Sequence, residues 1–437
     1  MLAMTLRLAM GFVEEGHRGP PIPEDTPMHQ HRSRTTRTLV TAFSATALAS
    51  TVLIAGPATA GPGHGQHGHG HHGHGHGQHG HKHAPYLRTI TALDSPRGVA
   101  ALGRGRTLVT EGDGSFSLVV EKGRRRARVT ELGTVPGAVG VAPAVAAGTD
   151  GTVYLLSGAG EPGTGAASLY TWSPGDDAPA LLADIAAYQA EDPDPSNVEG
   201  VPEESNPFGL AAHPDGGVLV ADAAGNDVLR VTEEGEISTL ARVMPRTIEV
   251  PDGLPPTDPE GNPLPPAGTP IPSEAVTTSV AVGPDGAVYI GELRGFPATP
   301  GTSQVWRVEP GATEALCDPM NPDTGDCTVE ADGLTSINDL AVDRRGSIYV
   351  STLSKASWLA WELGVEGSEV GGLFILTHPR SGGTQVKELV RDQLTLTAGV
   401  DVGPDGRVFV TSPIFGPGAL SELVWSKAKG TKHHHRR

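Results

Sequence analysis

Six segments of the chain share one pattern of apolar and polar positions: an apolar run, a glycine-centred polar turn and a second apolar run. Four clear copies read PFGLAAHPDGGVLVAD, TTSVAVGPDGAVYIGE, INDLAVDRRGSIYVST and TAGVDVGPDGRVFVTS, and they begin at Pro207, Thr277, Ile337 and Thr397. Weaker copies begin at Pro96 and Ala142. Two short strands rich in Val, Ile, Leu and Tyr around a tight Gly turn are typical of a β-hairpin. Six such hairpins in one chain predict an all-β fold, a six-bladed β-propeller.

The third copy shows what a whole blade contains. Strands are expected at 208–212, 218–221, 227–232 and 237–241, so we expect four-stranded blades. The turn glycines of the last four copies are Gly216, Gly286, Gly346 and Gly406. Their spacing exceeds the roughly 40–50 residues that a four-stranded blade needs, which predicts long insertions between the strands.

The two ends of the repeat array predict how the ring closes. The last copy stops after a third strand near 420–425, whereas 86–93 (YLRTITAL) reads as a strand without a hairpin partner. We predict that this N-terminal strand completes the last blade, which removes exposed sheet edges, and that residues 86–428 form one domain. The residues at one aligned position of the first strands are small, as crowding near the ring axis requires: Gly98, Ala144, Gly209, Ser279 and Gly399.

The N-terminal region, residues 1–60, has the features of a secretory signal peptide. Arg32, Arg34 and Arg37 precede an apolar run at 39–55, and Ala58-Thr59-Ala60 provides a cleavage site of small residues. We predict cleavage after Ala60 and secretion. A membrane anchor is the alternative, but the run is short for a span, and no other run is long enough to cross a membrane. Because Met28 would be a usual start, residues 1–27 read as an over-extended beginning.

A Gly/His tract at residues 61–85 follows the predicted cleavage site, and its composition cannot bury a core. We expect a disordered linker whose closely spaced imidazoles can bind a divalent metal; a plain polar spacer is the alternative. The candidate metal ligands are His64, His67, His69, His71, His72, His74, His76, His79, His81 and His83. Residues 429–437 form a basic, His-containing tail.

The formal net charge of −18 argues for a soluble protein and against nucleic acid or anionic lipid as a partner. We expect a monomer. The two cysteines, Cys317 and Cys327, predict a disulfide in an exported chain, which loop-closure entropy makes worth about 2–3 kcal/mol. A redox or metal-binding role is the alternative, but the spacing is not CxxC and no His lies nearby.

Two stretches resemble the ScyD/ScyE family: LLADIAAYQAEDPDPSNVEGVPEESNPFGLAAHPDGGVLVADAAGNDVLRV and TTSVAVGPDGAVYIGELRGFPATPGTSQVWRV. Within the first, GGVLVADAAGNDVLRV resembles an NHL-type propeller repeat. The likeness extends over nearly all of residues 86–425, and it does not include the Gly/His tract. It implies an exported six-bladed propeller. It implies little chemistry, because the family has no settled catalytic residues to carry over.

The long insertions are expected on one face of the ring, which we call the long-loop face. Crossovers between blades and loops between second and third strands both lie there. The insertions are an acidic crossover at 185–206, a Pro-rich crossover at 246–275, the Cys317–Cys327 loop and a second-to-third-strand loop at 353–372. Long loops on a rigid scaffold usually carry function, so we expect this face to bind a small molecule or a protein.

Polar residues at strand ends near this face are candidate ligands. Asp222 and Glu292 end second strands, and Asn338 and Asp339 lie at the start of the fifth inner strand. Carboxylates around a channel mouth could hold Ca²⁺ or another divalent cation. The alternative is that Asp222 and its equivalents cap turns through backbone N–H groups. Arg294 either pairs with Glu292 or meets an anionic ligand.

Two further features lie in the long loops. Trp358 and Trp361 can stack on a planar ligand or pack their loop onto the ring. The segment 192–203 (DPDPSNVEGVPE) has oxygen-bearing residues at the first, third, fifth and last positions of a calcium loop. It lacks the usual Gly and contains prolines, so we favour an acidic surface loop.

The sequence contains no HExxH, GxSxG, P-loop or CxxC motif. The residues favour an exported binding or scaffolding propeller, with no certain cofactor, over an enzyme. One alternative is a metal-dependent, lactonase-like hydrolase or lyase that uses Asp222, Glu292 and Asp339 around a cation. The other is extracellular metal binding by the Gly/His tract.

Overall fold

The computed structural model describes residues 84–123, 126–138, 144–258, 261–378 and 382–425. The predicted signal peptide, the histidines of the Gly/His tract and the C-terminal tail lie outside these described residues. In the described part the secondary structure is almost entirely β, with two short helices, α2 (Ile185–Glu191) and α3 (Trp358–Glu362). No helix there is long and apolar enough to cross a membrane.

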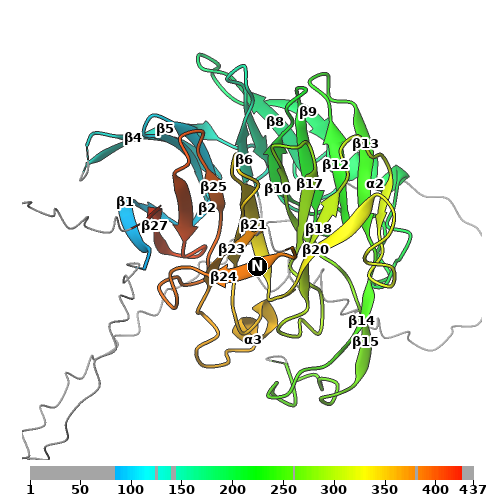
Figure 1. Cartoon of the computed structure of the whole chain (residues 1–437). Coiled ribbons are helices and arrows are strands. Elements are labelled where there is room, and N and C mark those ends of the chain that lie inside the picture. Colours follow the sequence, from blue (N-terminus) through cyan, green and yellow to red (C-terminus); the bar gives the residue numbers. More distant parts are fainter. Residues whose placement is uncertain (1–83, 124–125, 139–143, 259–260, 379–381, 426–437) are drawn as a thin grey trace, which may run out of the picture. The chain divides into compact units, whose positions relative to one another are not determined.

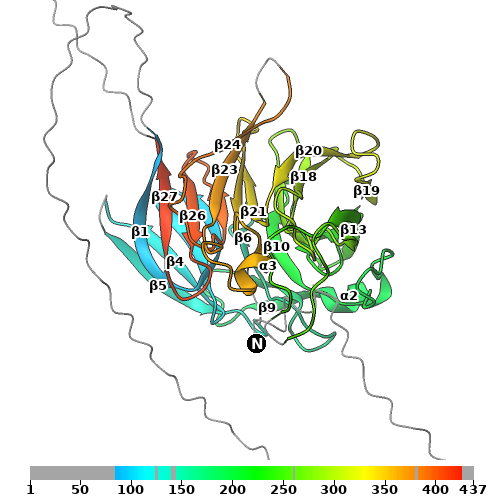
Figure 2. The same ribbon diagram turned by 90° about the horizontal axis from the view of Figure 1, so that it is seen from below.

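The strands form six four-stranded antiparallel blades, which confirms the predicted six-bladed β-propeller (Figures 1 and 2). Blade one contains β2 (Pro96–Gly103), β3 (Arg106–Glu111), β4 (Ser115–Glu121) and β5 (Ala127–Thr134). Blade two contains β6 (Ala144–Ala147), β7 (Val153–Leu156), β8 (Ser168–Trp172) and β9 (Ala180–Asp184). Blades three and four contain β10 (Pro207–Ala212), β11 (Val218–Asp222), β12 (Asp227–Val231) and β13 (Ile237–Val243), then β16 (Thr277–Val282), β17 (Val288–Glu292), β18 (Ser303–Val308) and β20 (Cys327–Leu334).

Blades five and six contain β21 (Ile337–Val342), β22 (Ile348–Thr352), β23 (Gly372–Thr377) and β24 (Gln385–Glu388), then β25 (Val400–Val402), β26 (Val408–Ser412), β27 (Pro417–Val424) and β1 (Tyr86–Asp94). Two strands outside the blades, β14 (Arg246–Glu249) and β15 (Pro270–Ser273), form a hairpin in the Pro-rich crossover. The inner strands β2, β6, β10, β16, β21 and β25 each contact the next, and β25 contacts β2. The described blades therefore form a closed ring.

The N-terminal strand β1 completes blade six, as predicted. It pairs antiparallel with β27 from Tyr86 opposite Val424 to Asp94 opposite Pro417, so the blue and red ends of the ring lie side by side (Figures 1 and 2). Two arginines of blade six, Arg88 and Arg407, share the carboxylates of Glu422 and of Glu121, which lies on β4 of blade one. This network of partly buried charges links the last blade to the first.

The hydrophobic core lies between the blades. Six clusters of buried residues each span one pair of neighbouring blades, because alternate side chains of every strand point to opposite faces of its sheet. A seventh cluster lies beneath the long loops and includes Trp358, Leu396 and Ile414. Each blade is thus held on both faces, and the long loops have a core of their own.

Close approach of the inner strands explains the small residues predicted at the ring axis. A Cβ atom on Gly209 would lie 2.5 Å from the Thr278 carbonyl oxygen and 2.8 Å from the Ser279 Cα of the next blade. A Cβ on Gly98 would lie 3.0 Å from the backbone nitrogen of Val145 in blade two. Larger side chains at these positions would force the blades apart.

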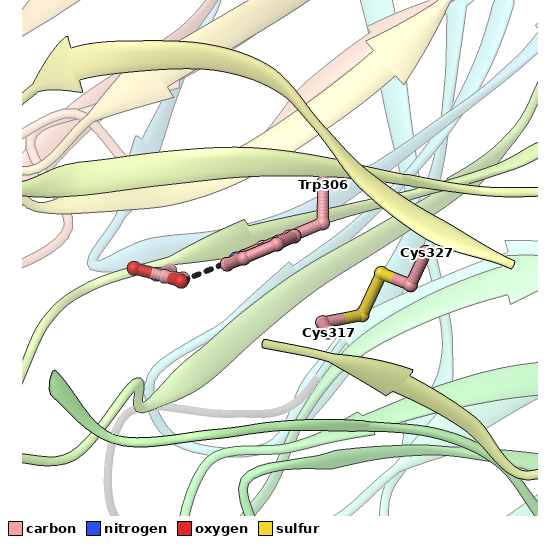
Figure 3. Close-up of a disulfide and its surroundings, with 4 residues drawn as sticks. Trp306, Cys317 and Cys327 are labelled. Atoms are coloured by element: carbon pink, nitrogen blue, oxygen red, sulfur yellow. Dashed lines mark hydrogen bonds between the residues drawn. A yellow bond between two sulfur atoms is a disulfide. The ribbon is translucent and has the colours of Figure 1, made fainter. Parts of the chain in front are cut away.

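The Cys317–Cys327 disulfide forms as predicted, with the two Cα atoms 4.9 Å apart (Figure 3). The expectation that its loop belongs with the crossovers between blades is wrong, because it joins β18 to β20, the third and fourth strands of blade four. Inside the loop, β19 (Ala315–Cys317) pairs in parallel with β13, so the disulfide joins a fifth strand on blade three to the outer strand of blade four. Both cysteines are fully buried in the cluster that contains Trp306.

Gly209→Ala is expected to lower the free energy of unfolding by about 1–3 kcal/mol, because the new Cβ would overlap backbone atoms of the neighbouring blade. Gly209 does not have a positive φ, so the loss would report on blade packing rather than on backbone strain. Urea unfolding followed by circular dichroism measures it.

Ala144→Gly is the matched control, because Ala144 occupies the aligned position of blade two. In this variant the added Gly increases only the conformational freedom of the unfolded chain, so the free energy of unfolding is expected to fall by about 0.5–1 kcal/mol. If Gly209→Ala were as stable as the wild-type protein, the inner strands would not be packed as closely as described.

Candidate functional site

The six inner strands surround a central cavity of about 260 Å³, and every one of them contributes to its lining. The walls consist largely of backbone and small side chains, a direct result of crowding at the ring axis. Ligand pockets usually measure roughly 300–1,000 Å³, so this cavity suits a small molecule.

One end of the cavity lies beneath the long-loop face. The inner strands begin at this end, since the crossover from each preceding blade arrives there. We define the channel mouth by one lining residue at or just before the start of five of these strands and by one loop residue between β26 and β27. These residues are Arg97, Phe208, Thr278, Asn338, Ala398 and Ile414. The Asn338 Nδ2 donates a hydrogen bond to the Ala398 carbonyl oxygen at 3.2 Å, which joins blades five and six at the mouth.

Arg97 is the charged residue of the channel mouth, and only 7% of its surface is exposed. Its Nε and Nη1 atoms are buried, and neither has a hydrogen-bond partner within the described part of the chain. The guanidinium carbon lies 4.9 Å from the centroid of the Phe415 ring. Burial lowers the pKa of Arg97 to about 10. The mouth therefore contains a cation with unused hydrogen-bond donors.

The two predicted tryptophans have different positions. Trp358 is fully buried in the cluster beneath the long loops, and its Nε1 donates to the Arg294 carbonyl oxygen at 2.7 Å. Trp361 is half-buried and stacks on Phe415, with ring centroids 5.2 Å apart and planes 9° apart. Trp358 thus packs its loop onto the ring, while Trp361 supports the aromatic ring next to Arg97.

Two aspartates also line the channel and connect blades five, six and one. The Oδ2 of Asp339 accepts a hydrogen bond from the Val400 backbone nitrogen at 2.8 Å, and the Oδ2 of Asp401 accepts one from Ala101 at 2.6 Å. Burial, with a smaller contribution from Asp401, raises the pKa of Asp339 to about 7. Burial also raises the pKa of Asp401 to about 6. Both carboxyls therefore titrate near neutral pH.

Asp222 does not reach the channel mouth. It is fully buried, and its Oδ1 accepts hydrogen bonds from the backbone nitrogens of Asn206, Ala224 and Gly225 at 2.8, 3.0 and 3.1 Å. Its Oδ2 accepts one from the Ser205 hydroxyl at 2.6 Å. These contacts match the capping alternative, and they attach the end of the acidic crossover to blade three.

Glu292 is likewise fully buried and pairs with Arg294, which is 1% exposed. The same carboxylate accepts a hydrogen bond from the Trp306 indole nitrogen, shown by the dashed line in Figure 3. Arg294 Nη1 also donates to the carbonyl oxygens of Ser273 and Glu274 at 3.4 and 3.3 Å. The pair therefore fixes the end of the Pro-rich crossover and offers no free group to a ligand.

Asp222, Glu292 and Asp339 are thus committed to separate backbone and ion-pair contacts. Among the described residues between 84 and 425, no group of three or more His, Cys, Asp or Glu side chains is placed to hold a metal ion. At the channel mouth the charged group is the Arg97 guanidinium, which repels a cation. The Asn338 carboxamide could offer a cation only one neutral oxygen ligand. This set of residues does not fit Ca²⁺, which takes six to eight oxygen ligands.

The segment 192–203 does not form a calcium loop. The Asp192 carboxylate faces Thr239 and Arg242, each at 2.6 Å, whereas Asp194 accepts a hydrogen bond from the Asn226 Nδ2 at 3.1 Å. Side chains of the first and third ligand positions therefore point to different partners.

A cluster of acids instead lines a second, small cavity of about 20 Å³ between the two crossovers; it comprises Asp194, Glu199, Glu204 and Glu274. Burial, and then the neighbouring carboxylates, raise the pKa of Glu199 to about 8. Burial and Asp194 raise the pKa of Glu274 to about 7. Sequence reasoning missed this cluster because Glu274 comes from a different insertion than the other three.

Sequence reasoning also missed Arg97, Asp401 and Phe415. A signal was present for the first two: Arg97 stands where other repeats have Phe208, Thr278 or Ala398, and Asp401 stands where the other five have Ala. Phe415 had no such signal, because it lies in a loop outside the repeated pattern.

Comparison with solved structures gives likeness in fold. A crystal structure of a glucose dehydrogenase has a TM-score of 0.50 and 15% identity, covering 78% of this chain and all (100%) of that one. The PQQ-bound aldose sugar dehydrogenase of Streptomyces coelicolor has a TM-score of 0.45 and 15% identity, covering 78% of this chain and 98% of that chain. A Xanthomonas campestris gluconolactonase has a TM-score of 0.45 and 13% identity, and the match covers 79% of this chain and 95% of that chain. No family model matches the chain, and no curated protein matches it.

The raised pKa values predict how stability depends on pH. Between about pH 4 and pH 7 the folded protein retains protons on Asp339 that an unfolded chain with a usual Asp pKa near 3.9 has released. The free energy of unfolding should therefore fall as pH rises through this window, by up to about 1.4 kcal/mol per pH unit for each such proton. Asp339→Asn is expected to flatten this dependence in urea unfolding measured from acidic to neutral pH.

Asp405→Asn is the matched control, since Asp405 is exposed in the first hairpin turn of blade six. This variant should keep the pH dependence of the wild-type protein. Parallel pH profiles for Asp339→Asn and the wild-type protein would show that the pKa of Asp339 is not raised in the folded protein.

Proposed function

We propose that the protein is an exported binding propeller, in keeping with its resemblance to the ScyD/ScyE family, and that it holds a small molecule at the channel mouth. The observation that carries the proposal is the central cavity of about 260 Å³ beneath the long-loop face. Its mouth combines apolar walls from Phe208 and Ile414 with polar groups from Arg97 and Asn338. Concave pockets with apolar walls and a few placed polar groups are the usual ligand sites of proteins.

The surroundings of the mouth support a preformed site. Asp222 and the Glu292–Arg294 pair attach two long crossovers to the ring, and Trp358 anchors the loop that carries Trp361. A site whose walls are already fixed loses little conformational entropy when a ligand binds.

Binding is favoured over cation-dependent hydrolysis or lyase chemistry. That chemistry needs several oxygen ligands within about 2.3–2.6 Å of one ion, and the carboxylates of Asp222 and Glu292 are already satisfied by protein groups. Arg97 gives the described part of the mouth a positive charge.

Export is supported by the buried Cys317–Cys327 disulfide, because disulfides form and persist in oxidising compartments. The signal peptide and its cleavage after Ala60 remain predictions from the sequence.

Phe208→Ala is expected to weaken ligand binding by about tenfold or more, because it removes an apolar wall that would contribute about 1.5–3 kcal/mol on full burial. The ligand would first be found by thermal unfolding against a panel of organic acids, sugars and nucleosides. Isothermal titration calorimetry then compares the Kd of the wild-type protein with that of the variant.

Val386→Ala is the control, since it removes a 42%-exposed apolar side chain from the outer strand β24 of blade five. Its Kd should equal that of the wild-type protein. The proposal fails if no compound raises the Tm, or if the compounds that do so bind equally well to Phe208→Ala.

A further inference from the structure

Arg97 is a buried cation that has no counter-ion among the described residues. An arginine remains protonated when buried, and a buried charge without a partner is strongly unfavourable. Arg294, which is buried to a similar degree, has Glu292 as its counter-ion. Arg97 has no ion pair and no hydrogen bond to Nε or Nη1 within the described residues.

Other arginines with an unpaired buried nitrogen do not share this problem. In Arg242 this atom is Nη1, but Nη2 of the same guanidinium pairs with the Asp192 carboxylate at 2.6 Å. In Arg246 the unpaired atom is Nε, but Nη1 pairs with the Asp332 carboxylate at 3.6 Å. Among the arginines of the described residues that have an unpaired buried nitrogen, Arg97 is thus the one without a carboxylate.

The position of the Arg97 guanidinium is well defined. It lies over the face of Phe415, which is itself stacked on Trp361. Gly112 leaves room beside it, since a Cβ atom on Gly112 would lie 3.0 Å from Nη2 and 3.4 Å from Nε. An aromatic ring beneath a guanidinium stabilises the cation and leaves its in-plane N–H donors free.

We infer that Arg97 is the receptor for an oxyanion group, a carboxylate or a phosphate, of a small planar ligand in the channel mouth. Planar bidentate pairing is the geometry in which guanidinium groups bind such anions. The apolar side chains of Phe208 and Ile414 line the same mouth and would contact the body of the ligand. This inference rests on the proposed function, because it names the chemistry of that same site.

The test uses three probes that share one ring system: 2-naphthoate, 2-naphthyl phosphate and the neutral 2-naphthamide. Smaller carboxylates, from acetate to benzoate, extend the series in case the ring is too large for the mouth. Calorimetry at low salt and pH 7.5 is expected to give binding of an anionic probe that is at least tenfold tighter than binding of its neutral counterpart. The carboxylate and phosphate arms decide which oxyanion is preferred.

Arg97→Gln is expected to weaken binding of the anionic probe by about 10–100-fold, the range for a charge-assisted hydrogen bond, and to leave the neutral probe unchanged. Arg97→Lys should recover part of the affinity, because it keeps the charge without the planar donors. Gly112→Ala keeps the arginine at position 97 but should weaken anion binding, since the new Cβ would displace the guanidinium from its place.

Stability of the ligand-free protein gives a readout that needs no probe. Arg97→Met replaces an unpaired buried cation with an apolar side chain of similar length, so it is expected to raise the Tm. The same variant should lose the rise in Tm that the anionic probe gives to the wild-type protein. A higher Tm together with a loss of anion binding would show that Arg97 contributes to binding and not to stability.

The outcomes separate this inference from the proposed function. If neutral and anionic probes bind equally and both lose affinity in Phe208→Ala, the channel site stands and the oxyanion receptor is overturned. If no carboxylate or phosphate probe binds in an Arg97-dependent way at millimolar concentration, the receptor is also overturned. If, in addition, no compound of the wider panel binds in a Phe208-dependent way, the proposed function fails as well.

Discussion

Closure of the ring by β1 on β27 is the contact on which the rest of the structure depends. It joins the two ends of the described chain in one blade, so that every blade packs against a neighbour on both faces. Without β1, strand β27 would present a free edge, and the cluster between blades six and one would lose Leu93. The Arg88–Glu422 contact joins β1 to β27, and the Arg407–Glu121 contact joins blade six to blade one.

A closed ring of six blades also determines where chemistry can occur. The inner strands approach so closely that most of their side chains must be small, as the contacts of Gly98 and Gly209 show. A large or charged residue on an inner strand is therefore a departure from the repeat that the fold must accommodate. Arg97, Asp339 and Asp401 are such departures, and all three line the central cavity.

The blades were predictable because a hairpin is a local feature, in which Val-rich strands and a Gly turn lie within sixteen residues of one another. The role of β1 followed from counting strands. The roles of the carboxylates were not predictable, since they depend on partners that only the fold brings near, such as Trp306 for Glu292 and Ser205 for Asp222. A carboxylate at a strand end looks the same in sequence whether it binds a ligand or caps a turn.

The two most buried arginines of the described residues, Arg97 and Arg294, differ in their partners. Arg294 is paired with Glu292, which is bonded to Trp306, and the whole group holds a crossover in place. Arg97 has an aromatic support from Phe415 and Trp361 but no counter-ion in the described residues. An aromatic ring without a counter-ion orients the guanidinium but leaves its N–H donors without acceptors. Such a buried charge lowers the stability of the protein unless a ligand supplies the acceptors. This difference separates a structural ion pair from a binding group at the same face of the ring.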